Sequence, residues 1–196
     1  MTGARARQGA ALLGVVGLWL VTCAPVAAQT YLEGYRGPYR GRVVDAETRE
    51  PLAGVVVVAF WRRERIVPLH TRSEFYAAQE ALTDTDGQFV LDARAIESGA
   101  PERTLPPYFE IFLPGYASLR HPARFTRGFQ KGRLDEPGVL VGLPRLSREE
   151  RLENLLRLDL NEAPYETVPN FIRLINIERA EFGYGPVYQQ PRKEQP

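Results

Sequence analysis

Histidine and cysteine, the side chains that most often ligate metals or act as nucleophiles, are scarce in this chain. Its 196 residues include two histidines, His70 and His121, and one cysteine, Cys23. A single cysteine excludes an internal disulfide and any zinc site built from several thiolates. Neither histidine begins a His-x-x-Glu zinc pair, and no serine lies in a nucleophile motif. We therefore expect no metal, no cofactor and no catalytic residue.

Two aspartates beside a glycine, Asp84 and Asp86 before Gly87, suit either a calcium loop or a β-turn. A calcium loop of the EF-hand type needs further oxygen ligands and a glutamate at its twelfth position, whereas an apolar strand pattern follows Gly87. In a turn, Asp84 would bind the backbone and Gly87 would supply a positive φ. We expect the turn.

Basic and aromatic residues are neighbours in two segments, one after Trp61 and one at 117–138. The candidate ligand contacts in these segments are Trp61, Arg62, Arg63, Arg120, Arg124 and Phe125. Such mixtures can bind nucleic acid, but a net charge of +1 lacks the required field, so an anionic glycan or an acidic protein fits better. The alternatives are solvated arginines and, for Trp61, a place in the core at the end of a buried strand.

The overall composition is typical of a soluble globular domain, with 44% apolar and 25% charged residues. It excludes collagen-like, coiled-coil and multi-pass membrane proteins. The 17 glycines and 16 prolines supply many turns.

Residues 1–28 have the pattern of an export signal. Arg5 and Arg7 precede an uncharged apolar stretch from about residue 9 to 21, and small residues follow up to Ala28. The stretch is shorter than the ~20 residues of a membrane-spanning helix, and the small residues suit signal peptidase. We expect cleavage after Ala28, which would leave a net charge of −1 and no cysteine.

Two alternatives remain open for this segment. The residues before Cys23 are similar to a lipoprotein box, in which Cys23 would be lipidated, although Thr22 departs from that pattern. An uncut N-terminal anchor is the other alternative. The expected location is periplasmic or secreted, or attached to the envelope through Cys23, with membrane contact only in a lipid-anchored form.

Residues 39–146 show short apolar runs separated by turn residues, which predicts an antiparallel β-sandwich. We expect strands at 39–45, 54–61, 77–83, 88–92, 108–113 and 139–143, and loops at 62–75 and 117–138. The strands at 77–83 and 88–92 should form a hairpin, with Phe89 and Leu91 pointing inward. The run at 54–61 is apolar on both faces, so a further layer should cover its second face.

Residues 147–188, after the predicted sandwich, change to a helical period. We also expect a flexible lead-in at 29–38, before the sandwich, and a disordered tail at 189–196. Ser147 and Glu150 form a capping-box pattern, and a second helix should run from about 170 to 182 with Gly183 as its C-cap. The expected apolar faces are Leu152, Leu155 and Leu156 in the first helix and Phe171, Leu174, Ile175 and Ile177 in the second. These helices are the candidates to cover the sheet.

Four segments in a fixed order, at 41–45, 50–55, 83–89 and 114–116, resemble the carboxypeptidase regulatory-like domain. The resemblance spans 39–146 and implies a transthyretin-like (prealbumin-like) sandwich, with the helices added to it. In metallocarboxypeptidases this domain accompanies a catalytic zinc domain whose motifs are absent here. Hydroxyisourate hydrolases of the same fold end in Tyr-Arg-Gly-Ser, whereas this chain has Tyr-Arg-Gly at 35–37 without the serine. The resemblance therefore implies a module that packs, tethers or binds.

Three hypotheses follow from these patterns. The favoured one is an exported, non-catalytic β-sandwich that binds a protein or glycan of the cell envelope, or makes a structural contact there. The second is a carbohydrate-binding module that uses the basic and aromatic segments. The third is a hydrolase, which requires His70 or His121 to lie beside acidic groups in a cleft.

Overall fold

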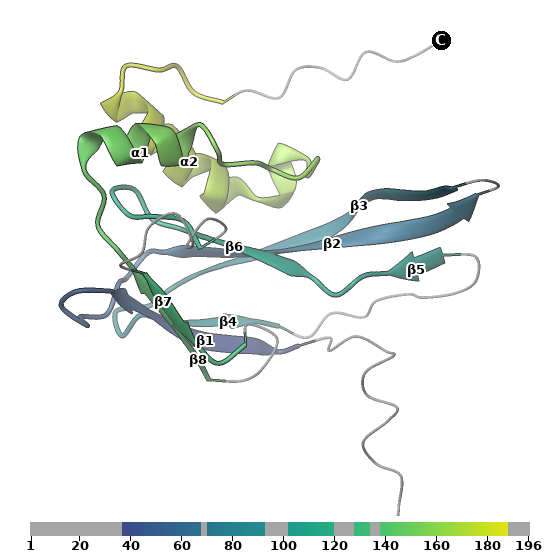
Figure 1. Ribbon diagram of the computed structural model, residues 1–196, viewed down its shortest axis with the longest axis horizontal. Coiled ribbons are helices and arrows are strands. Elements are labelled where there is room, and N and C mark those ends of the chain that lie inside the picture. Colours follow the sequence, from purple (N-terminus) through teal and green to yellow (C-terminus); the bar gives the residue numbers. More distant parts are fainter. Residues whose placement is uncertain (1–36, 68–69, 93–101, 120–127, 134–137, 188–196) are drawn as a thin grey trace, which may run out of the picture.

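The structure is a computed structural model that describes residues 37–67, 70–92, 102–119, 128–133 and 138–187. Two sheets pack face to face, and two helices lie on the outer side of one of them (Figure 1). Sheet A has the strand order β4-β1-β8-β7; sheet B has the order β3-β2-β5, with β6 also paired to β2. The prediction of a mainly β sandwich with two C-terminal helices is confirmed.

Sheet A consists of β1 (Tyr39–Asp45), β4 (Gln88–Leu91), β7 (Phe129–Lys131) and β8 (Val139–Leu143). Sheet B consists of β2 (Val56–Val67), β3 (His70–Leu82), β5 (Glu102–Thr104) and β6 (Tyr108–Phe112). The helices are α1 (Arg148–Leu155) and α2 (Pro169–Glu181), with a short 3-10 turn η2 (Tyr165–Thr167) between them. Within the described residues, no helix has the length and apolar character needed to cross a membrane.

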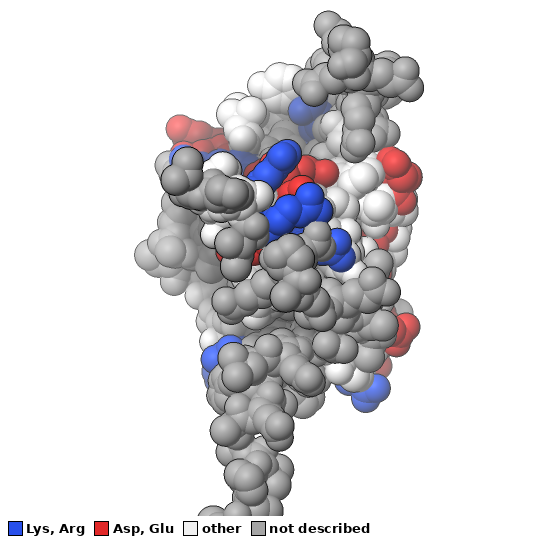
Figure 2. Space-filling view, turned by 90° about the vertical axis from the view of Figure 1, so that its right-hand side faces the viewer, with Lys and Arg blue, Asp and Glu red and all other residues white. Residues whose placement is uncertain are grey.

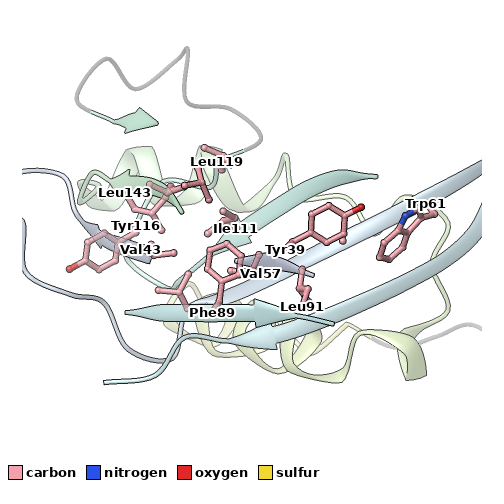
Figure 3. Close-up of a cluster of buried hydrophobic side chains, with 14 of the residues drawn as sticks. Tyr39, Val43, Val57, Trp61, Phe89, Leu91, Ile111, Tyr116, Leu119 and Leu143 are labelled. Carbon is pink, nitrogen blue, oxygen red and sulfur yellow. The ribbon is translucent and has the colours of Figure 1, made fainter. Parts of the chain in front are cut away.

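The first half of β2, residues 56–61, is buried on both faces, as its apolar run predicts. Val57, Ala59 and Trp61 belong to the core between the sheets, where they meet Phe89 and Leu91 of β4 (Figure 3). The alternate residues Val56, Val58 and Phe60 pack instead against the helices. Because alternate side chains of a strand point to opposite faces, one strand supplies two cores.

Helix α2 closes the outer face of sheet B through Phe171. This ring is fully buried and meets Phe60 and Phe112 edge to face, with ring centroids 6.5 and 6.1 Å apart. Burial of such a side chain contributes about 2 to 3 kcal/mol before conformational entropy is subtracted. The second core therefore depends on the C-terminal segment, and the expected covering role of the helices is confirmed.

Two residues assigned to the helices' apolar faces lie in solvent instead. Leu156 is 71% exposed, because α1 ends at Leu155 and Leu156 is its C-cap. Ile177 is 45% exposed, because two residues turn an α-helix by about 200° and so place it away from the buried Ile175. The predicted capping box of Ser147 and the left-handed Gly183 after α2, at φ 74°, are both confirmed.

The expected loop at 62–75 is wrong, because residues 62–67 belong to β2 and residues 70–75 to β3, and the two strands pair up to Val67 and His70. Trp61 packs against Tyr39, the first residue of β1, so the part of β2 after Trp61 continues past the end of sheet A. Residues 62–65 are charged on both faces of the strand, so the sequence there lacks the alternation that identifies a half-buried strand. Figure 2 looks onto this end of the molecule, where basic and acidic side chains lie side by side.

The hairpin expected at 77–92 is also wrong, although its turn is confirmed. Asp84 Oδ1 accepts hydrogen bonds from the backbone N–H groups of Asp86 and Gln88, and Gly87 has φ 73°. The turn carries the chain from β3 in sheet B to β4, which pairs with β1 in sheet A. The same turn can join two paired strands of one sheet or two strands of different sheets. The packing of the core decides between these two connections.

Two further differences concern sheet A. Strand β1 pairs with β8 in parallel, so the sandwich is mostly, not wholly, antiparallel. Strand β7 lies inside the segment 117–138 that was expected to be a loop, and it pairs with β8. Its three residues are too few for periodicity to reveal them.

Candidate binding surface

The two outer faces of the sandwich differ in what covers them. The helices bury the outer face of sheet B, and the outer face of sheet A lies on the opposite side of the molecule (Figure 1). Strand β1 shows the contrast directly: Tyr39 and Val43 are buried, while Arg40 and Arg42 are exposed. Because both arginines occupy alternate positions, they share the outer face, with Cα atoms about 7 Å apart.

Strand register places further side chains beside these arginines. Arg42 lies between Gln88 of β4 and Leu140 of β8, and Leu140 is next to Lys131 of β7. In the neighbouring row, Arg40 is paired with Val90. We call the surface formed by Arg40, Arg42, Gln88, Val90, Lys131 and Leu140 the open face.

A shallow groove of about 810 Å³ runs over this surface. Arg40, Arg42, Gln88, Val90 and Leu140 line it, together with Asp86 and the backbone of β1, β4 and β8. Val90 is 48% exposed and adds apolar surface beside the two arginines. The groove therefore combines cationic and apolar groups in one place.

The guanidinium groups of the open face have spare donor capacity. Arg42 Nε donates to the backbone oxygen of Asp86 at 2.8 Å, which orients the side chain without neutralising it. Within the described residues, neither Arg40 nor Arg42 forms an ion pair with a carboxylate. Planar guanidinium groups bind carboxylates and phosphates with two parallel hydrogen bonds, so this surface suits an anion.

A cation–aromatic pair lies next to the open face, in the following row of sheet A. Phe129 of β7 is paired with Gly142 of β8, and its ring fills the space that a Cβ at Gly142 would occupy. The guanidinium carbon of Arg49 lies 4.0 Å from the centre of this ring. Arg49 thereby adds positive charge while covering the aromatic surface.

Other polar groups hold the fold together, and the clearest case is Asp45 at the end of β1. Its carboxylate is buried and accepts hydrogen bonds from the N–H groups of Glu47 and Thr48, from Arg145 Nε and from the Tyr116 hydroxyl. Burial alone would raise the pKa of Asp45, but these hydrogen bonds outweigh it and hold the pKa below its ordinary value of 3.8. Burial raises the pKa of Tyr116 above 10.0. The cluster fixes a turn and leaves no oxygen directed at a ligand.

Chemically active groups are not gathered at one place in the described chain. No three histidine, cysteine, aspartate or glutamate side chains lie close enough there to hold a metal ion. His70 is exposed at the start of β3, opposite Val67, and lies outside the groove; His121 falls outside the described residues.

The residues chosen from the sequence as candidate ligand contacts do not form one surface. Trp61 is fully buried in the inter-sheet core, where the alternative interpretation placed it. Arg62 points toward the helical segment, where it pairs with Glu162 at 3.3 Å, and Arg63 stacks over Tyr76 at 4.1 Å on the other face of β2. Arg120, Arg124, Phe125 and the lipidation candidate Cys23 lie outside the described residues.

Sequence reasoning did not select Arg40 and Arg42, although a signal for them exists. The run Tyr39-Arg40-Gly41-Arg42-Val43 alternates strictly between apolar or small residues and arginines. In a strand, that period puts both cations on one face and the apolar residues on the other.

No protein-family model matches the chain, and no curated protein or solved structure shows a significant similarity to it.

Proposed function

We propose that this chain is an exported, non-catalytic binding module that holds an anionic partner in the cell envelope on its open face. One observation carries the proposal: helices cover the outer face of sheet B, whereas a groove with Arg40 and Arg42 crosses the outer face of sheet A. The resemblance to carboxypeptidase regulatory-like domains supports it, because such domains accompany other machinery.

An acidic protein segment is the partner that the surface favours. Two arginines whose Cα atoms lie about 7 Å apart match carboxylates on alternate residues of an extended chain, whose Cα atoms have the same spacing. Val90 and Leu140 offer apolar contact for the methylene groups of these acidic side chains. A glycan would require an aromatic ring free to stack on its sugars, and Arg49 covers the ring of Phe129 beside the open face.

Binding of a fluorescent poly-glutamate peptide tests this function directly. Because charge attraction and bidentate hydrogen bonds act together, the Arg40→Ala/Arg42→Ala variant should bind at least about tenfold more weakly, and binding of the wild type should weaken with salt. Arg173→Ala, which removes an exposed arginine of α2, is the matched control and should bind like the wild type. An equal affinity of all three proteins would contradict the proposal.

Capture from envelope extracts then identifies the natural partner class. A protein retained by the wild type and lost with the double variant supports an acidic protein partner. An acidic polysaccharide that shows the same difference supports the carbohydrate-binding alternative instead. If nothing distinguishes the two baits, the open face is not the binding site.

Export is tested separately, by the mass of the N-terminal peptide of the protein isolated from its host. Cleavage after Ala28 gives a chain that begins at Gln29, whereas lipidation gives an acylated Cys23 at the N-terminus. A cytosolic protein that retains residues 1–28 would contradict both forms of the proposed export.

A further inference from the structure

Strand β3 forms an edge of sheet B along the protruding hairpin. Its backbone pairs with β2 alone within the described part of the chain, and 71–75 lie beyond Trp61, where sheet A has ended. An edge of this kind presents a row of backbone N–H and C=O groups that a further strand can use. The register shift between Trp61 and Arg62 lies at the body side of this stretch and leaves 71–75 regular.

Arg72 on this edge lies next to another arginine and is not paired with a carboxylate of the described chain. Arg72 lies directly opposite Arg65 of β2, and like charges in that position are destabilising. Glu74, two residues further along the same face, is 3.9 Å from Arg65. Arg72 forms no ion pair with any described residue. The edge thus offers one cation that lacks an acidic neighbour of its own.

A second copy of the same strand supplies that neighbour. If two β3 strands run antiparallel with Ser73 opposite Ser73, Arg72 of each copy lies opposite Glu74 of the other, and Thr71 lies opposite Phe75. The pairing forms two equivalent ion pairs and a row of backbone hydrogen bonds, in which the Ser73 backbone oxygen, already an acceptor for Arg62 Nη2 at 3.0 Å, uses its second lone pair. The two-fold axis is perpendicular to the joined sheet, so both copies present the same face of sheet B on the same side. The two β-sandwiches therefore lie at opposite ends of the joined hairpins.

We infer that the chain forms a two-fold symmetric dimer through residues 71–75 of β3. Charge complementarity of the strand with itself selects this occupant over an unrelated extended segment. The hairpin end carries basic and acidic side chains next to one another, as the ion pairs require (Figure 2). This inference is independent of the open face, which lies on the other sheet.

Sedimentation equilibrium of the full chain tests the dimer. Arg72→Glu and Glu74→Arg each place like charges opposite one another at two positions, so each should raise the dimer dissociation constant by about tenfold or more. The double variant Arg72→Glu/Glu74→Arg restores opposite charges and should recover most of the affinity. Circular dichroism checks folding, since Arg72 is exposed and Glu74 is at most half-buried.

A disulfide at the symmetry axis tests the register. Facing residues of antiparallel strands have Cα atoms about 4.5 to 5.5 Å apart, within reach of a disulfide. In a Cys23→Ser background, Ser73→Cys should oxidise to a covalent dimer, while Thr85→Cys, exposed in the turn after β3, should not. A monomer at millimolar concentration, or single charge variants that dimerise like the wild type, would overturn the inference.

Discussion

Arg151 of α1 donates two hydrogen bonds to Glu178 of α2, from Nε to Oε1 at 2.9 Å and from Nη2 to Oε2 at 2.7 Å. Oε2 also accepts the backbone N–H of Gly115, in the turn after β6. Only 2% of the Glu178 side chain is exposed, so the carboxylate depends on these donors in place of water. One buried anion thus ties both helices to the end of sheet B.

Replacement of Glu178 by alanine should therefore be costly. It leaves the Arg151 guanidinium and the Gly115 N–H without their acceptor, and we expect a loss of about 2 to 3 kcal/mol in the free energy of unfolding. Urea denaturation measures this loss. Glu181→Ala removes an exposed acid from the same helix and should change stability by less than about 0.5 kcal/mol. Equal effects of the two variants would refute the role of the pair.

The buried carboxylate of Asp45 should make stability depend on acid. Its folded-state pKa lies below 3.8, so its contribution is complete above that value and is lost as the pH falls through the folded pKa. Asp45→Asn should be less stable than wild type by about 2 kcal/mol at neutral pH, and the difference should shrink below pH 4. Urea denaturation across pH measures both.

The exposed Asp92 provides the control for this experiment. Asp92→Asn should follow the wild-type profile, because its carboxylate has no comparable set of donors in the described structure. A constant gap between wild type and Asp45→Asn down to pH 2 would show that ionisation of Asp45 is irrelevant to stability.

Gly54 and Gly87 have nearly the same φ, but only Gly87 lies against other atoms. Alanine substitutions at these two positions therefore separate the free-energy cost of a left-handed backbone from the cost of steric crowding. Gly54 has φ 72° with open space where a Cβ would lie, while at Gly87, φ 73°, a Cβ would overlap the backbone oxygen of Val43. Gly54→Ala should cost about 1 kcal/mol for the left-handed conformation alone. Gly87→Ala should cost at least about 2 kcal/mol more, since the turn between the sheets must move. Thermal and urea unfolding give the difference; similar losses would contradict the close approach.

Adjacent leucines at the end of α1 test which side of the helix is buried. Leu155 is 6% exposed and belongs to the core under the helices, whereas Leu156 is 71% exposed. Leu155→Ala should lower the free energy of unfolding by about 2 to 3 kcal/mol, and Leu156→Ala by less than about 0.5 kcal/mol. Equal losses would show that α1 packs through the whole face that the leucine spacing predicts, with Leu155 and Leu156 both buried.

The N-terminus of α2 is capped by a residue that is distant in the sequence, so a local sequence pattern could not predict the cap. No side chain of its own N-cap residue, Val168, caps the helix. Glu80 of β3 accepts the N–H groups of Asn170 and Phe171 at 2.7 and 3.0 Å instead. A cap that comes from 90 residues away leaves no local pattern, so sequence reasoning found the helix but not what fixes its start.

The sequence by itself determined the elements whose signals act over a few residues. The apolar run of β2, the Asp84–Gly87 turn and the Ser147 capping box all depend on neighbours along the chain, and all are confirmed. A strand apolar on both faces also required a covering layer, which located the helices correctly.

Only the tertiary structure decided which strands pair and which surface stays open. The Asp84–Gly87 turn suits a hairpin and a crossing between sheets equally well, and burial of Phe89 and Leu91 against β2 settles the choice. The charged residues 62–65 belong to a strand because their backbone pairs with β3 and β5, and not because they present an apolar face. Arg40 and Arg42 line an exposed groove on sheet A, while the C-terminal helices cover sheet B, and strand alternation alone cannot specify where distant helices pack.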